Sequence, residues 1–324
     1  MTLHRRHLLA AGATLALPGL LHAQPEKTPI RILVGFPPGG ATDAIARTVV
    51  ERLPPLLGQP VIVENKAGVG GRMAAEALLT LPADGNAFMV APNATPVFQT
   101  LVFADQIKWD ILRDFVPVAA FASYPLGMGV ALNTGASNVR EFVAWVKANP
   151  GKASFGTPGL GGQNAFLGVA FAKAAGIDLP VIPYKGSPPM VTDLVGGQVP
   201  SAISLMDGMM AHHQAGRIRV IGVFTKERSP LMPEIPTFVE QGVDVSSGEG
   251  WTGMWARAGT PQAAVDRMQQ AVRQVLQQPE VRETLIKRLW AYPQFRSNAE
   301  VDTLLRAELA YWAPIIKASG FKAN

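Results

Sequence analysis

The sequence contains no cysteine and very few histidines. Of its five histidines, only His212 and His213 lie beyond the first 23 residues, and they are adjacent. Without cysteine the chain can form no disulfide, no thiolate metal site and no cysteine nucleophile. Adjacent helical residues point about 100° apart, so these two histidines cannot easily converge on one metal ion or proton. We therefore expect them at a solvated helix end, and we expect neither a catalytic triad nor a metal site.

Charged residues are also scarce, and their pattern excludes one class of partner. They make up 16% of the 324 residues, and the formal net charge is +5. No basic run with interleaved aromatic residues occurs, so nucleic acid is not an expected partner. Hydrophobic residues make up 48% of the chain. This composition and length favour a folded chain with a large core, divided between two lobes.

The first 23 residues have the order of a secretory signal peptide. Arg5 and Arg6 form a basic start, and the uncharged run Leu8–Leu21 that follows is too short to span a bilayer. Ala23 supplies a small residue at the cleavage position. The paired arginines are also compatible with twin-arginine export. We therefore expect residues 1–23 to be removed and the remainder, which lacks a cysteine for a lipid anchor, to be soluble in the periplasm.

Short apolar strands, glycine-rich turns and amphipathic helices alternate along the rest of the chain. One unit leads from a strand at 30–36 through the turn 37–42 into a helix. Another leads from a strand at 153–156 through the loop 157–162 into a helix at 164–175. This alternation predicts parallel strands in doubly wound sheets, and hence an α/β fold.

Two segments, 115–124 and 224–233, have the character of short irregular links between lobes. If the chain crosses at both, one lobe contains both ends of the chain. The sequence therefore predicts a first lobe of residues 24–120 plus 228–324 and a second lobe of residues 121–227. Two crossings of this kind form a natural hinge.

Two glycine-rich loops are the strongest candidates for a binding site. The loops 36–42 and 157–163 each bring backbone N–H groups to a helix start, where uncapped amides and the helix dipole attract a carboxylate. Glycine lets the backbone approach a ligand closely, although the same glycines could serve only to close tight βα turns. Their spacing does not fit a dinucleotide fingerprint, and no phosphate-loop or zinc-protease motif occurs, so we expect no cofactor. Phe36, Tyr184 and Trp251 could supply apolar walls or belong to the core.

A series of short motifs follows one order along the chain. The motifs are Phe36–Asp43, Val63–Gly71, Ala83–Gly85, Pro183–Ser187, Thr192–Leu194, Gly196–Val199 and Ala258–Pro261. Taken together they resemble the Bug (TctC-like) proteins, the extracytoplasmic solute receptors of tripartite tricarboxylate transporters. The resemblance implies a type II periplasmic-binding-protein fold, with two lobes around a central cleft, and a small carboxylate as the ligand. It also implies membrane permease subunits as partners, and a monomeric receptor without catalytic residues.

The resemblance assigns ligand-binding residues to the two loops and to positions near them. In this family the first loop and the helix-start loop of the second lobe face the ligand carboxylate. The residues that match these positions are Phe36, Pro37, Gly39, Gly40, Thr42, Asp43, Thr157, Gly161, Gly162, Gln163, Tyr184, Lys185, Gly186 and Ser204. Two residues depart from the pattern, since Gly162 stands where the family commonly has serine and Ala165 where it commonly has histidine. Gly162 loses the hydroxyl contact but keeps its backbone N–H as a donor.

Two other functions stay open on the sequence alone. A sensor subunit that presents a bound ligand to a signalling partner would need the same cleft. An exported enzyme acting on a small organic acid would have Asp43, Lys185 and Asp207 as its available acid–base groups.

Overall fold

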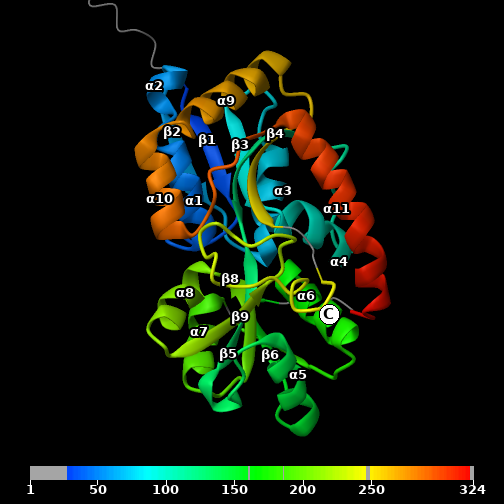
Figure 1. Ribbon diagram of the computed structural model, residues 1–324. Coiled ribbons are helices and arrows are strands. Elements are labelled where there is room, and N and C mark those ends of the chain that lie inside the picture. The colour runs from blue at the N-terminus through cyan, green and yellow to red at the C-terminus, as the bar shows by residue number, and fades with distance from the viewer. Residues whose placement is uncertain (1–27, 160, 185, 246–248, 322–324) are drawn as a thin grey trace, which may run out of the picture.

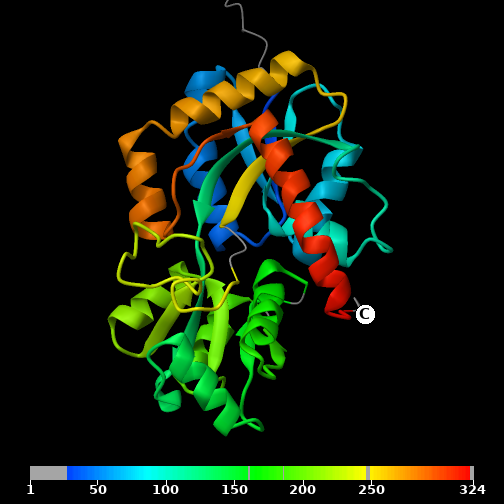
Figure 2. The same cartoon turned by 45° about the vertical axis from the view of Figure 1, so that its right-hand side comes forward.

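The computed structural model describes residues 28–159, 161–184, 186–245 and 249–321. Two lobes lie one above the other, and each contains a β-sheet flanked by helices (Figure 1; Figure 2). This arrangement confirms the predicted two-lobed α/β architecture. The predicted signal peptide, residues 1–23, lies outside the described residues. Within the described ranges, no helix has both the length and the apolar character that crossing a membrane requires.

The first lobe is built on a six-stranded sheet. Its strands are β1 (Ile30–Val34), β2 (Val61–Asn65), β3 (Ala87–Pro92), β4 (Phe115–Tyr124), β10 (Gly250–Arg257) and β11 (Arg296–Ser297). Their order across the sheet is β11-β4-β10-β3-β1-β2. β1 pairs in parallel with β2 and β3, whereas β10 runs antiparallel to β3 and β4. Because helices cover both faces, β3 is buried at every position and its sequence is continuously apolar.

Helices from both ends of the chain cover this first sheet. They are α1 (Ala41–Val50), α2 (Pro54–Leu57), α3 (Arg72–Thr80), α4 (Thr100–Val102), α9 (Gln262–Val275), α10 (Pro279–Leu289) and α11 (Asn298–Ala318), with the short segments η1 (Val69–Gly71) and η2 (Ala94–Gln99). α1 and α9 contribute Val49 and Val272 to one buried cluster. α3 and α11 contribute Leu78 and Leu305 to another cluster, on the opposite face of the sheet.

The second lobe repeats this plan with a five-stranded sheet. Its elements are β5 (Leu126–Ala131), η3 (Leu132–Thr134), α5 (Val139–Ala148), β6 (Phe155–Thr157), α6 (Gln163–Ala175), β7 (Val181–Pro183), α7 (Ser187–Val195), β8 (Ser201–Leu205), α8 (Asp207–Gln214) and β9 (Ile218–Val223). The strand order is β7-β6-β8-β5-β9. β6 pairs in parallel with β7 and β8, and β5 runs antiparallel to β8 and β9.

The antiparallel strands correct two parts of the sequence-based prediction. Parallel pairing is confirmed only within the βα units of each sheet. The segment 115–124, expected as an irregular link, is the ten-residue strand β4. Pro117 makes this strand hard to recognise in the sequence, because proline has no N–H to donate to a neighbouring strand. The structure accommodates Pro117 beside a register shift between Met254 and Trp255 in the pairing of β4 with β10.

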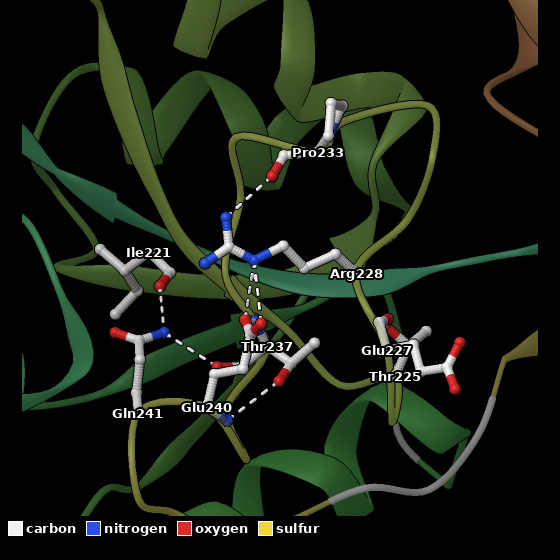
Figure 3. Close-up of polar contacts among 8 residues, drawn as sticks. All are labelled: Ile221, Thr225, Glu227, Arg228, Pro233, Thr237, Glu240 and Gln241. Atoms are coloured by element: carbon white, nitrogen blue, oxygen red, sulfur yellow. Dashed lines mark hydrogen bonds and ion pairs between the residues drawn. The ribbon is translucent and has the colours of Figure 1, made fainter.

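The chain passes between the lobes twice, once in the short step from β4 to β5 and once in the long connection from β9 to β10. In this connection Arg228 Nε donates to the two carboxylate oxygens of Glu240 at 3.0 and 2.9 Å. Its Nη1 donates to the Pro233 carbonyl at 2.9 Å (Figure 3). The side-chain amide of Gln241 donates to the Ile221 carbonyl at 2.8 Å. The Arg228 contacts fix the shape of the returning segment, and the Gln241 contact holds it against β9 of the second lobe before it enters the first.

Buried side chains also join the two lobes. Phe98 of η2 stacks on Phe166 of α6, with ring centroids 6.0 Å apart. The Phe98 ring also lies 5.0 Å from that of Trp312 on α11. Both views show the C-terminal part of α11 beside α6 (Figure 1; Figure 2). α6 therefore belongs to the second lobe and also packs on the first.

Substitution of Gly168 tests how tightly α6 packs on its own sheet. Alanine in place of a helical glycine ordinarily stabilises a helix by about 1 kcal/mol. At Gly168, however, an added Cβ would lie 2.2 Å from the ring of the buried Phe155. We therefore expect Gly168→Ala to lower the free energy of unfolding by about 1–3 kcal/mol in a urea titration. The matched change Gly208→Ala in α8, where the nearest atom is 3.8 Å away, should be neutral or stabilising. Equal effects of the two changes would contradict this packing.

Candidate functional site

A cleft of about 1100 Å³ lies between the two lobes. From the first lobe it is lined by the loop between β1 and α1, by residues of η1 and η2, and by Phe103. From the second lobe it is lined by the loop between β6 and α6, by the end of β8 and by the first two turns of α7 and α8. The loops that follow β1, β6 and β8 thus share one cavity at the carboxyl ends of their strands, which is where ligands bind in open α/β sheets.

Three helices begin at this cleft with glycine as the N-cap residue. Gly40 caps α1, Gly162 caps α6 and Gly186 caps α7, and all three line the cleft. The first amides of a helix have no partner within it, and glycine has no side chain with which to accept from them. At α7 the first three residues are Ser187, Pro188 and Pro189, and of these only Ser187 has an N–H, because proline has none. The cleft is therefore bounded by the amides at the starts of α1 and α6, by that of Ser187, and by the positive ends of three helix dipoles.

The fourth helix start at the cleft, that of α8, carries its own acid. Asp207 lines the cleft, and its Oδ1 accepts a hydrogen bond from the Gly208 amide at 2.8 Å. Burial raises the pKa of Asp207, although the hydrogen bond from the Gly208 amide opposes this shift. The carboxylate therefore occupies the anion position of α8 and places a titratable negative charge on the second-lobe wall.

The structure corrects the expectation that His212 and His213 lie at a solvated helix end. His212 lines the cleft, and its Nδ1 atom is buried with no hydrogen-bond partner among the described residues. Burial lowers the pKa of His212, and the charge of Arg217 lowers it further. His213 Nδ1 instead accepts a hydrogen bond from the Val220 amide of β9 at 3.2 Å. The angle between adjacent helical residues explains why the two rings have different surroundings.

Asp43 organises the first loop from behind the cleft wall. The residue is 2% exposed, and its carboxylate accepts from the Gly39 amide at 2.9 Å, Arg47 Nε at 2.9 Å and Asn65 Nδ2 at 2.8 Å. Asn65 Nδ2 also donates to the Phe36 carbonyl at 2.9 Å. Burial raises the pKa of Asp43, but the three hydrogen bonds and the Arg47 charge outweigh burial and leave the pKa below its usual value. The ionised carboxylate therefore fixes the shape of the loop.

Thr157 and Tyr184 organise the second-lobe loop in a similar way. Thr157 is fully buried, and its hydroxyl donates to the Gly159 carbonyl at 3.1 Å. The Tyr184 amide donates to the Thr157 carbonyl at 2.9 Å, and the Tyr184 hydroxyl donates to the Asp193 carboxylate at 2.9 Å. Burial, together with the bond to Asp193, raises the pKa of Tyr184 to about 12. These contacts bring β6 and β7 together beneath the loop.

The sequence-predicted ligand residues fall into two groups. Those that line the cleft are Phe36, Pro37, Gly39, Gly40, Thr42, Gly162 and Gly186. Those that lie outside the lining are Asp43, Thr157, Gly161, Gln163, Tyr184 and Ser204. The Ser204 hydroxyl lies 3.2 Å from that of Ser187, which does line the cleft. At Gly161 an added Cβ would be 3.1 Å from Val102 of the first lobe, so Gly161 lies at a contact between lobes. Lys185 lies outside the described residues.

Several lining residues are not among the predicted ligand residues, although Asp207 is one of the predicted acid–base candidates. They are Val69, Gly70, Ala94, Gln99 and Phe103 in the first lobe, and Ser187, Val191, Leu205, Asp207 and His212 in the second. Two signals could have found some of these residues. Val69 and Gly70 lie within the second family motif. Leu205 is the last residue of β8, and ligands bind at the carboxyl ends of strands in such sheets. Gln99 and Phe103 carry no such signal, because tertiary folding alone brings η2 and α4 to the cleft.

Backbone dipoles supply positive potential at the described part of this cleft. None of the described lining residues is lysine or arginine. In the described part of the chain, no group of three histidine, aspartate or glutamate side chains could hold a metal ion. Phe36, Phe103 and Leu205 add apolar surface beside the helix starts. The arrangement therefore suits a small anion with an apolar body, held by neutral donors.

Known proteins are similar to this chain in sequence and in fold. Residues 45–321 match the family model described as the tripartite tricarboxylate transporter family receptor. BugT from Bordetella pertussis is 30% identical over 315 residues, which cover 97% of this chain and 96% of BugT. MatC from Rhodopseudomonas palustris, solved with bound malate, has a TM-score of 0.78 at 25% identity and is matched over 90% of this chain and 99% of its own. A second R. palustris protein, solved with adipate, has a TM-score of 0.82 at 28% identity, with 91% and 98% of the two chains covered. The chain therefore belongs to the tripartite tricarboxylate transporter family of receptors, as its motifs predict.

Proposed function

We propose that this protein is a periplasmic solute receptor that captures a small carboxylate between its lobes and delivers it to the membrane subunits of a tripartite tricarboxylate-type transporter. The observation that carries the proposal is the convergence of three glycine-capped helix starts on one cleft. Malate and adipate, present in two similar structures, are both small carboxylates and support this ligand class. Membership of the receptor family supports the role in transport.

The ligand carboxylate would lie among the starts of α1, α6 and α7. Each helix start carries about half a positive charge, so three together can offset one carboxylate without a basic side chain. Phe36 and Phe103 from the first lobe and Leu205 from the second would contact the body of the ligand. The negative charge of Asp207 would disfavour a further carboxylate near the start of α8.

Capture of a ligand between the lobes would favour their closed arrangement. A ligand that contacts α1 from one lobe and both α6 and α7 from the other gains its full binding energy only when the lobes are close. We propose that the two lobes move about the two chain passages. The predicted bounds of 24–120 plus 228–324 and 121–227 shift at both passages. β4 keeps residues 121–124 in the first sheet, and Phe238 and Gln241, which contact α6 and β9, keep the segment 228–241 with the second lobe. The closed form is the one that we expect the membrane subunits to recognise.

The proposal includes export, a monomeric state and the absence of catalysis. Residues 1–23 would direct the chain to the periplasm and then be removed. Asp207 and His212 are the titratable groups among the described residues that line the cleft, and we assign them to ligand selection. The ligand would accordingly leave the cleft chemically unchanged.

Filling one helix start tests the site without disturbing the fold. Gly162 has φ −104° and ψ 170°, which any residue can adopt, and an added Cβ meets nothing within 4 Å. We expect Gly162→Leu to weaken carboxylate binding by about tenfold or more, which corresponds to roughly 1.4 kcal/mol, because the side chain would occupy the space in front of α6. The measurement is isothermal titration calorimetry with a carboxylate panel that includes malate and adipate, supported by ligand-dependent thermal shifts.

The control for this test is Gly151→Leu, another glycine whose added Cβ meets nothing within 4 Å. Gly151 lies between α5 and β6, away from the lining residues, so its replacement should leave binding unchanged. Normal binding by Gly162→Leu would show that the loop assignment is wrong. Failure of the unaltered protein to bind any member of the panel would count against the ligand class itself.

Removal of the Asp207 charge tests whether this acid selects against additional anionic groups. We expect Asp207→Asn to strengthen dicarboxylate binding near neutral pH by about three- to tenfold, since removing a negative charge near an anion gains on the order of 1 kcal/mol. Burial raises the pKa of Asp207 and lowers that of His212. Acidification protonates both groups, which removes the negative charge of Asp207 and adds a positive charge at His212. The affinity of the unaltered protein should therefore rise as the pH falls, and that of Asp207→Asn should rise less.

Asp178→Asn, at an exposed position after α6, is the matched control and should change neither the affinity nor its pH profile. A loss of binding in Asp207→Asn would show instead that the ligand donates a hydrogen bond to this carboxylate. Titration calorimetry at several pH values distinguishes the two results.

A further inference from the structure

Glu308 is a buried acid at the junction between the lobes. It lies on α11 and is 9% exposed. Its Oε1 accepts a hydrogen bond from Trp251 Nε1 at 2.9 Å, and its Oε2 accepts one from Asn93 Nδ2 at 3.4 Å. The same amide nitrogen of Asn93 donates to Gln163 Oε1 at 3.1 Å. Glu308, Trp251 and Asn93 belong to the first lobe, whereas Gln163 is the first residue of α6 in the second.

This network lies directly behind the wall of the cleft. Gly162, which precedes Gln163, is the N-cap of α6 and lines the cleft. Ala94, which follows Asn93, lines the cleft from the first lobe. The bond from Asn93 to Gln163 therefore joins the two walls at the point where the start of α6 faces the ligand space. A change at Glu308 can reach the start of α6 through a single intervening side chain, that of Asn93.

Burial dominates the chemistry of the Glu308 carboxyl. It raises the pKa of Glu308 to about 7, although the hydrogen bonds from Trp251 and Asn93 and the Arg296 charge on β11 act in the opposite direction. The other titratable group that faces it is Tyr124 on β4, whose pKa is raised by burial and further by the Glu308 charge. The partners from β10, from the end of β3 and from α6 are uncharged, so Arg296 is the one cation that acts on Glu308 among the described residues.

We propose that Glu308 is a positioning residue that holds the start of α6 against the first lobe through Asn93, and that closure of the lobes on a carboxylate is coupled to proton uptake at Glu308. This inference rests on the proposed receptor function. Opening of the cleft would draw Gln163 away from Asn93, admit water to the carboxyl and let it ionise. Closing would remove that water and return the proton to the carboxyl.

The direction of the pH dependence follows from this coupling. The closed state binds the proton more tightly than the open state, in which the carboxyl is hydrated and has its ordinary pKa of 4.5. The contribution of Glu308 to closure is therefore complete below about pH 4.5 and is lost as the pH rises through about 7. Because the pKa of Glu308 differs in this way between the closed and open states, ligand affinity should fall about tenfold between roughly pH 6 and pH 8.

Calorimetry in buffers of different ionisation enthalpy measures the coupled proton on the unaltered protein. With malate or adipate as the titrant near pH 7, we expect Glu308 to contribute uptake of about half a proton. Glu308→Gln should lose this uptake and flatten the affinity profile, and Glu308→Asp, which keeps a carboxyl, should retain part of both. Asp207→Asn should keep the proton uptake that Glu308 contributes. Glu76→Gln, at an exposed position on α3, should show the same proton uptake and affinity profile as the unaltered protein.

A measurement without ligand separates this inference from the proposed function. Hydrogen-exchange protection of α6, corrected for the intrinsic effect of pH, should fall between about pH 6 and pH 8 in the unaltered protein and stay constant in Glu308→Gln. Binding with equal proton uptake in Glu308→Gln overturns the inference and leaves the receptor function intact. If no carboxylate binds, the receptor function fails, and the proton coupling to ligand fails with it. In that case pH-dependent protection of α6 still supports the positioning role, and constant protection overturns it.

Discussion

Backbone amides in the first turn of an α-helix have no hydrogen-bond partner inside the helix, and this constraint organises the cleft. At α1, α6 and α7 the N-cap is glycine, so no side chain of the cap competes for these amides. Polar side chains nearby are engaged elsewhere, since Asp43 is bonded to Arg47 and Asn65 behind the first loop, and Thr157 bonds within its own loop. In the proposed receptor, one small anion would interact with all three helix starts at once.

The sheet topology explains why these helix starts meet in one place. In a parallel βα unit the helix begins where the strand ends, so the starts of α1, α6 and α7 follow the carboxyl ends of β1, β6 and β7, as the start of α8 follows that of β8. The antiparallel strands have a different role. β4 leads out of the first sheet into β5 of the second, and the chain returns from β9 to β10. These two passages fix the carboxyl ends of both sheets against the same cavity, so that neither lobe alone forms the site.

Local signals account for most of what the sequence predicts correctly, and long-range contacts account for what it misses. The βα units and the glycine-rich loops are each contained in a short segment, and the structure places parts of both loops on the cleft. The sequence does not predict β4 as a strand, because it contains Pro117 and because its partner β10 is distant in sequence. Asp43 has the position of a cleft residue, yet Asn65 draws its carboxylate to the back of the loop. Phe103 and His212 reach the cleft only through the packing of η2, α4 and α8, which no local pattern encodes.

The place of Glu308 at the junction between the lobes explains its buried carboxyl better than a contribution to the stability of the fold does. Burying an acid costs free energy through lost hydration, and its hydrogen bond to Trp251 is not essential for burying an indole in this protein. Three other indole Nε1 groups are buried with no hydrogen-bond partner among the described residues, namely those of Trp109, Trp255 and Trp312. An apolar side chain in place of the acid could not accept from Asn93, whose amide also bonds Gln163 across the lobes. A junction made only of apolar contacts, such as those between η2, α6 and α11, would close the cleft equally at every pH. The acid makes the same junction sensitive to a single proton.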